Sequence, residues 1–120
     1  MKKIMLIDDD PTMLLLLRTL LEMEGFAVAT WSGGVNIYEE FEATAPEIVL
    51  LDVNLRGASG FDVLQNIRGN DQHRDTVVIM ASGMDVREQC TEMGANDFLL
   101  KPYMPNDLLK ALNTHVRAEV

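Results

Sequence analysis

The chain begins its first predicted element with Ile4-Met5-Leu6-Ile7-Asp8-Asp9-Asp10-Pro11, an apolar run that stops at three acids and a proline. The apolar residues do not alternate with polar ones, so a strand over residues 4–7 is apolar on both faces. Such a strand is typical of a parallel sheet that helices cover on both sides. Asp10 and Pro11 suit an N-cap and a first helical position, so the stretch predicts a buried strand that leads into a helix.

Further apolar runs repeat this pattern at residues 48–51, 77–80 and 98–100, and a weaker strand is expected over 27–31. Apolar residues at helical spacing fill three of the intervening segments. They are Met13, Leu16, Leu17, Leu20 and Leu21 before Gly25; Val86, Cys90 and Met93 before Gly94; and Leu108, Leu109, Leu112 and Val116. Five strands alternating with five helices predict a (βα)5 α/β fold, with residues 1–120 as a single domain.

Charge and composition exclude several classes of function. The chain carries 19 acidic and 10 basic residues, a formal net charge of −9, so we expect no direct binding to nucleic acid. Its one cysteine, Cys90, rules out an internal disulfide and a zinc cage. No apolar run approaches the length of a membrane span. We therefore expect a soluble, cytoplasmic domain that does not bind membranes.

Polar residues follow the predicted strands where each strand ends. Asp8 and Asp9 follow the first strand, Asp52 the third, Ser82 the fourth and Lys101 the fifth. Ligands of open parallel sheets bind beyond the carboxyl ends of the strands. Crowded carboxylates repel one another, and a hard cation such as Mg²⁺ relieves that repulsion. An ammonium and a hydroxyl suit phosphoryl oxygens, so the pattern predicts a metal-assisted phosphoryl site.

These residues carry a resemblance to a known family. The acids after the first strand are followed in order by Leu50-Leu51-Asp52-Val53-Asn54-Leu55 with Gly60, by Ala81-Ser82-Gly83 and by Phe98-Leu99-Leu100-Lys101-Pro102. This series resembles the receiver domain of bacterial two-component response regulators, of which a chemotaxis regulator is a member, and the resemblance spans the whole chain. It implies a doubly wound, flavodoxin-like parallel sheet with strand order 2-1-3-4-5.

The resemblance also implies the chemistry of the site. Asp52 would be the phosphoacceptor and would attack the phosphorus of a phosphohistidine or of a small acyl phosphate. Asp8, Asp9, Asp52 and the backbone carbonyl of Asn54 would hold Mg²⁺, with Asp9 as a direct ligand and Asp8 acting through water. The donor would be a sensor histidine kinase or a histidine phosphotransfer protein. On this interpretation the chain is a signalling phosphoacceptor rather than a conventional enzyme.

The same resemblance implies a conformational switch. Ser82 and Lys101 would bind phosphoryl oxygens, and phosphorylation would draw Ser82 and the loop after the fourth strand inwards. The ring of Phe98 would then occupy the vacated space. The fourth helix, fifth strand and fifth helix would present an altered face to a downstream output domain or protein.

Three residues depart from the family pattern. Arg56 stands where the family usually has proline, so we expect a less rigid loop after Asp52. Phe98 lacks the hydroxyl group of a tyrosine. Met104 stands where a capping hydroxyl is expected, so the last helix is expected to begin less firmly.

One surface is predicted on the first helix. The apolar stripe assigned to its core face leaves Leu14 and Leu15 directed to solvent, beside the acidic residues. Two adjacent exposed leucines predict a docking surface for a helix of the phosphodonor protein.

Two alternatives remain open at this point. Asp8-Asp9-Asp10-Pro11-Thr12 also fits the D-x-D-x-T pattern of haloacid-dehalogenase-like phosphatases, with Asp8 as nucleophile and Asp10 as general acid. That interpretation leaves Asp52 unexplained and the chain short for a cap. The other alternative is a receiver-like interaction module that needs no phosphorylation.

Overall fold

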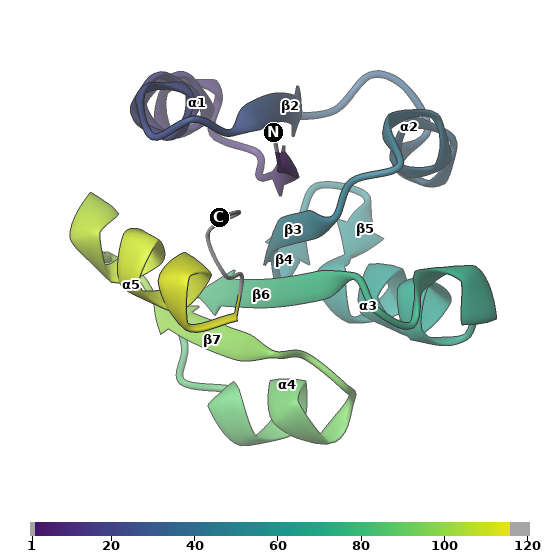
Figure 1. Ribbon diagram of the computed structural model, residues 1–120. Helices are drawn as coiled ribbons and strands as arrows, with labels where there is room; N and C mark the ends of the chain where they lie inside the picture. Colours follow the sequence, from purple (N-terminus) through teal and green to yellow (C-terminus); the bar gives the residue numbers. More distant parts are fainter. Residues whose placement is uncertain (1, 116–120) are drawn as a thin grey trace.

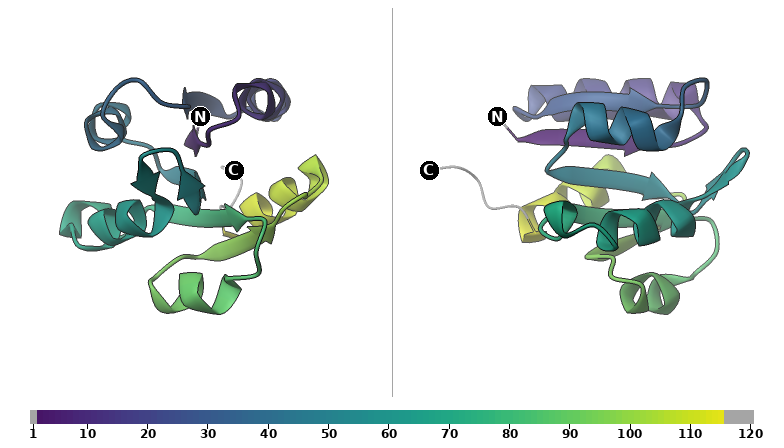
Figure 2. Two further views of the ribbon diagram at one scale, coloured as in Figure 1. Left: turned by 180° about the vertical axis from the view of Figure 1, so that it is seen from behind. Right: turned by 90° about the vertical axis from the view of Figure 1, so that its right-hand side faces the viewer.

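A five-stranded parallel sheet forms the centre of the computed structural model, which describes residues 2–115. Its strands are β1 (Lys3–Ile7), β2 (Ala27–Trp31), β3 (Ile48–Asp52), β6 (Val77–Ser82) and β7 (Asp97–Leu100). They lie in the order β2-β1-β3-β6-β7, which is the predicted order 2-1-3-4-5. Because the strands are parallel, their carboxyl ends meet at one edge, as the arrowheads show (Figure 2, right).

Helices cover both faces of this sheet (Figure 1). They are α1 (Pro11–Met23), α2 (Ile37–Thr44), α3 (Gly60–Arg68), α4 (Arg87–Glu92) and α5 (Pro105–His115), with a short 3₁₀ turn, η1 (Asp71–His73). Helices α1 and α5 pack on one face, and α2, α3 and α4 pack on the other. In β1, Ile4 and Leu6 belong to the core between the sheet and α1 with α5. Met5 and Ile7 belong to the core between the sheet and the other three helices. This confirms burial on both faces for the apolar runs of β1, β3 and β6, whereas Leu100 in the edge strand β7 is 47% exposed.

The segment between β3 and α3 forms a small hairpin that the sequence did not predict. Strands β4 (Asn54–Leu55) and β5 (Ala58–Ser59) pair antiparallel through two residue pairs. Gly60 follows at once as the first residue of α3, and its N–H donates to the carbonyl of Val53 across 2.7 Å. A Cβ atom at Gly60 would lie 2.7 Å from the Cα atom of Val53 and would also meet the carbonyl oxygen of Asp52.

The buried face of α1 differs from the predicted one. Leu14, Leu17 and Leu21 are buried, whereas Leu15 and Leu16 are 67% and 51% exposed. The exposure predicted for Leu15 is confirmed, but that predicted for Leu14 and the burial predicted for Leu16 are wrong. Apolar residues occupy every position from 13 to 17, so helical spacing alone allows more than one face.

The last two helices differ in how they are capped. Val86 is the N-cap of α4 and makes no side-chain capping bond, whereas Asp85 accepts from the N–H of Arg87 across 3.3 Å. At the start of α5, Asp107 accepts from the N–H of Met104 across 2.9 Å, which supplies a capping contact from within the helix. Among residues 2–115, no helix is long and apolar enough to cross a membrane.

Cys90 and Val116 were predicted in the apolar stripes of the last two helices. Cys90 is buried in the core, as predicted for the stripe of α4. Val116, predicted in the stripe of the last helix, lies outside the described residues.

We expect Gly60→Ala to lower the free energy of unfolding by about 2 kcal/mol or more, because the methyl group overlaps the backbone of Asp52 and Val53. Chemical denaturation of the purified variant measures this loss. Gly83→Ala is the matched control, since a Cβ atom there meets nothing within 4 Å. Equal stability of the two variants would show that the close approach at Gly60 does not constrain the fold.

Candidate functional site

Lys101 joins two predicted site carboxylates at the carboxyl edge of the sheet. Its ammonium donates to Oδ2 of Asp8 across 2.9 Å and to Oδ2 of Asp52 across 3.1 Å. Asp8 follows β1, Asp52 ends β3 and Lys101 follows β7, so strands far apart in sequence supply the cluster. The peptide bond between Lys101 and Pro102 is cis.

Backbone N–H groups also donate to each of the three site carboxylates. Asp8 accepts at Oδ1 from the N–H of Asp10 across 3.0 Å, and Asp52 accepts at Oδ1 from the N–H of Asn54 across 3.2 Å. Asp9 accepts at Oδ2 from the N–H of Arg56 across 2.7 Å. Each of the three carboxylates therefore has at least one oxygen fixed by the main chain.

Burial and charge act together on Asp52 and Lys101. Burial raises the pKa of the Asp52 carboxyl, and the neighbouring Asp8 raises it further, against the opposing effect of Lys101. Burial by itself would lower the pKa of Lys101, but its bonds to Asp8 and Asp52 outweigh burial and raise that pKa. Lys101 thus stays charged at neutral pH, and its one ammonium contacts the carboxylates of both Asp8 and Asp52.

The arrangement suits a small, hard cation. The side-chain donors of Asp8, Asp9 and Asp52 are carboxylate oxygens, the ligand type that Mg²⁺ prefers. Among residues 2–115, no group of three or more His, Cys, Asp or Glu side chains is arranged so that these side chains alone could hold a metal ion. Mg²⁺ does not need one, because it usually keeps several waters and uses one or two carboxylates. The residues at this edge therefore fit Mg²⁺ in donor chemistry.

Ser82 and Phe98 lie on the neighbouring strands β6 and β7. Ser82 ends β6 and is almost fully buried, and its hydroxyl oxygen accepts from the N–H of Met84 across 3.1 Å. The ring of Phe98 is 2% exposed, and the guanidinium of Arg87 lies 5.4 Å from its centroid. Arg87 also pairs with Asp97 across 3.7 Å. The ring predicted to move inwards on phosphorylation is therefore already buried in this structure.

Sequence reasoning missed Tyr103. Together with Met13, Lys101 and Pro102, this residue lines a mostly apolar cavity of about 330 Å³ that also contacts Asp8 and Asp10. Burial, with smaller effects of the nearby charges, raises the pKa of Tyr103 to about 12, so its phenol is neutral at physiological pH. The only feature of the sequence that could have pointed to Tyr103 is its position two residues after Lys101.

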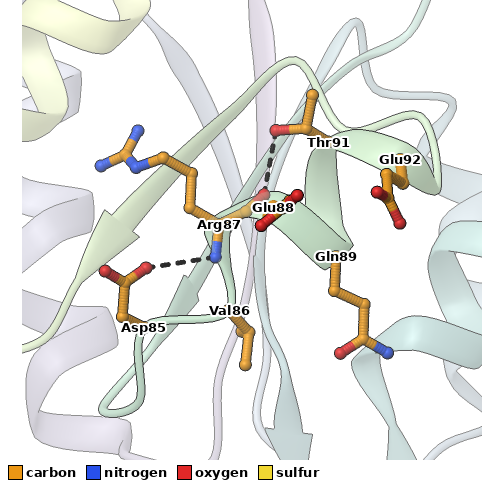
Figure 3. Close-up of a pocket in the computed structure, with 7 residues that line it drawn as sticks. All are labelled: Asp85, Val86, Arg87, Glu88, Gln89, Thr91 and Glu92. Atoms are coloured by element: carbon orange, nitrogen blue, oxygen red, sulfur yellow. Dashed lines mark hydrogen bonds between the residues drawn. The ribbon is translucent and has the colours of Figure 1, made fainter.

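A larger and more open hollow lies along α4 (Figure 3). Its volume is about 810 Å³, and residues between Asp85 and Glu92, except the buried Cys90, line it; none of them is a predicted site residue. Figure 3 shows the Asp85 carboxylate bonded to the N–H of Arg87 and the Thr91 hydroxyl bonded to the carbonyl of Arg87. These contacts satisfy the backbone of a short helix and do not form a second chemical centre.

Comparison with known proteins identifies the family. The profile of the response regulator receiver domain matches residues 4–113. The chain is 33% identical over 110 residues to the probable transcriptional regulator ycf27 of Guillardia theta, covering 89% of this chain and 42% of that regulator. It is 27% identical over 114 residues to the chemotaxis protein CheY of Thermotoga maritima, covering 93% and 95% of the two chains.

Solved structures agree with this match. The BeF3-activated N-terminal receiver domain of Klebsiella pneumoniae RstA superposes with a TM-score of 0.85 at 29% identity, covering 98% of this chain and all of that one. The response regulator TrrA of Thermotoga maritima in complex with Mg(2+)-BeF has a TM-score of 0.83 at 25% identity, covering 97% and 100%.

This chain belongs to the response regulator receiver domain family. Family membership makes it a signalling phosphoacceptor of the two-component type rather than a catalytic enzyme, and it decides against the dehalogenase-like phosphatase. The chain spans 42% and 48% of the length of the two ycf27 regulators that it matches.

We expect Asp52→Asn to raise the free energy of unfolding at pH 7 without divalent cations, by about 1 kcal/mol as is common for single stabilising substitutions. Because folding raises the pKa of Asp52, its ionised form costs stability above that pKa, and the cost disappears as pH falls through it. The gain should therefore shrink towards about pH 3. Lys101 keeps Asp8 as a partner in the variant.

Denaturant unfolding of both proteins from pH 7 down to about pH 3 measures this effect. Asp75→Asn, at an exposed position, is the control and should leave stability unchanged. A variant at Asp52 that is less stable than the parent at pH 7 would contradict the account.

Proposed function

We propose that Asp52 accepts a phosphoryl group from a sensor histidine kinase or a histidine phosphotransfer protein. The observation that carries this proposal is the ammonium of Lys101, which bridges the carboxylates of Asp8 and Asp52 at the sheet edge. An oxygen of Asp52 attacks phosphorus while the bond from phosphorus to the donor breaks. The added dianionic group then meets an ammonium that is already in place.

Asp8, Asp9, Asp52 and the carbonyl of Asn54 are the groups proposed to hold Mg²⁺. When bound, this cation neutralises charge on the transferring phosphoryl oxygens. Asp9 is suited to direct contact because its carboxylate makes no ion pair with Lys101, whereas Asp8 does. The relative TrrA was solved with Mg(2+)-BeF, which supports the proposal without placing a cation here.

The switch is proposed to act through Ser82, Phe98 and Arg87. A phosphoryl oxygen on Asp52 would draw the hydroxyl of Ser82 away from the N–H of Met84, which it now binds. That change shifts the loop that ends at Arg87, whose guanidinium covers Phe98. The face of α4, β7 and α5 then changes, because one of two existing states gains charge-assisted contacts.

The output of the proposed switch depends on the domain or protein that contacts the face of α4, β7 and α5. Some relatives, such as MtrA of Mycolicibacterium smegmatis, are DNA-binding response regulators, and this chain matches about half of that protein's length. We propose residues 1–120 as one receiver domain in the cytoplasm that passes the signal to an output domain or protein and does not itself bind nucleic acid.

The test of this proposal is the intact mass after incubation with Mg²⁺ and acetyl phosphate, a small acyl phosphate. We expect one added phosphoryl group on the wild type, none on Asp52→Asn, and none on the wild type after prior chelation of Mg²⁺. A phosphohistidine-bearing transfer protein serves as a second donor where acetyl phosphate is inert. An adduct that survives in Asp52→Asn would place the phosphoacceptor elsewhere. No adduct from either donor, with partner binding unchanged in Asp52→Ala, would favour the interaction module.

Leu15 and its neighbour Leu16 are proposed to dock the donor protein. Both leucines are at least half exposed on α1, whose N-cap, Asp10, directly follows Asp8 and Asp9. Leu14, predicted as the other half of this surface, is buried in the core and is not part of the proposal. Exposed leucines next to an acidic site offer apolar contact area to a partner helix.

We expect Leu15→Ser with Leu16→Ser to slow phosphotransfer from a protein donor by about tenfold or more, because contact area is lost. Phosphorylation by acetyl phosphate should be unchanged, which separates docking from chemistry. Met23→Ser, at a 78% exposed position at the far end of the same helix, is the matched control. Unchanged transfer from the protein donor would refute this surface.

A further inference from the structure

The hairpin of β4 and β5 carries a backbone donor to the Asp9 carboxylate. The N–H of Arg56 reaches Oδ2 of Asp9 across 2.7 Å, although the two residues are 47 positions apart in the chain. Within residues 2–115, no other donor to this carboxylate is found. The contact is made by the main chain, so it does not depend on the exposed arginine side chain.

The hairpin is fixed relative to Asp52 as well. The N–H of Asn54 donates to Oδ1 of Asp52, and Asn54 pairs with Ser59 across the hairpin. Leu55 is 9% exposed and belongs to the core cluster beneath α3. One short anchored segment therefore sets the orientations of both Asp52 and Asp9.

We propose that the backbone N–H of Arg56 is a positioning group for Mg²⁺ binding. It fixes Oδ2 of Asp9 before the cation arrives and leaves Oδ1 for the cation. Groups that orient a ligand carboxylate strengthen metal binding, because the carboxylate need not be ordered at the moment of binding. The inference rests on the proposed function, since it takes Asp9 to be a Mg²⁺ ligand.

A matched pair of variants isolates the N–H. Arg56→Ala and Arg56→Pro both remove the positive guanidinium, but only proline removes the donor. Arg56 has no positive φ and Gly57 has φ 72°, which is compatible with a type II turn, where proline is favoured at the position before glycine. Leu55 is in a strand, which is also compatible with a following proline.

The experiment is a Mg²⁺ titration of wild type, Arg56→Ala and Arg56→Pro by isothermal calorimetry, with fluorescence of Trp31 as a second signal. Trp31 is the one tryptophan of the chain, and its carbonyl accepts from the N–H of Asp8 across 3.1 Å. We expect Arg56→Pro to bind Mg²⁺ about tenfold more weakly than Arg56→Ala. Equal affinities of the two variants would overturn the inference. A wild type that does not bind Mg²⁺ would instead remove the proposed function, and the inference with it.

A second measurement does not need the proline variant to fold and needs no metal. Hydrogen exchange of the Arg56 amide is followed by NMR in the wild type and in Asp9→Ala. We expect the amide to exchange about tenfold faster or more in Asp9→Ala, because its acceptor is gone. The Gly60 amide, which donates to the carbonyl of Val53, is the internal control and should not change. Equal exchange of the Arg56 amide in both proteins would overturn the inference.

Discussion

The balance of charge at the carboxyl edge of the sheet is the constraint on which the site depends. Three carboxylates, those of Asp8, Asp9 and Asp52, gather where the structure supplies one ammonium, that of Lys101. Burial raises the pKa of Asp52, so keeping it ionised costs free energy at neutral pH. The edge is held by contacts from Lys101 and from backbone N–H groups, and it gains from any added cation. On this account, a divalent cation first offsets the excess negative charge of the carboxylates. It then offsets the charge of the phosphoryl group that Asp52 accepts.

The fold creates this imbalance because its strands are parallel and buried on both faces. Their carboxyl ends must meet at one edge. Asp8 after β1, Asp52 at the end of β3 and Lys101 after β7 therefore come into contact there. The close packing of Gly60 against the backbone of Asp52 places the start of α3 directly behind the acceptor. The buried charge of Asp52 therefore destabilises the edge where the chemistry is proposed, while the apolar cores on the two faces of the sheet stabilise the fold.

The strands and their terminal residues could be predicted from the sequence, because unbroken apolar runs ending in polar residues leave few alternatives. The buried face of α1 could not, since an unbroken run of apolar residues allows Leu14 or Leu16 to face inwards, and packing against the sheet makes the choice. The β4–β5 hairpin consists of two residue pairs, too short to give a periodic signal. The contact of Arg56 with Asp9 involves a backbone N–H, which every residue except proline has, so side-chain identity could not reveal it.

The most direct test of the account is the dependence of unfolding free energy on Mg²⁺ concentration at pH 7, with ionic strength held constant by Na⁺. A ligand that binds the folded state alone stabilises it by about 2.7 kcal/mol at a hundred times its Kd. The account predicts a rise of this form for the wild type and little or none for Asp9→Asn. A wild type whose stability does not change with Mg²⁺, or an equal rise in Asp9→Asn, would show that the acidic edge is not built to receive a cation at Asp9.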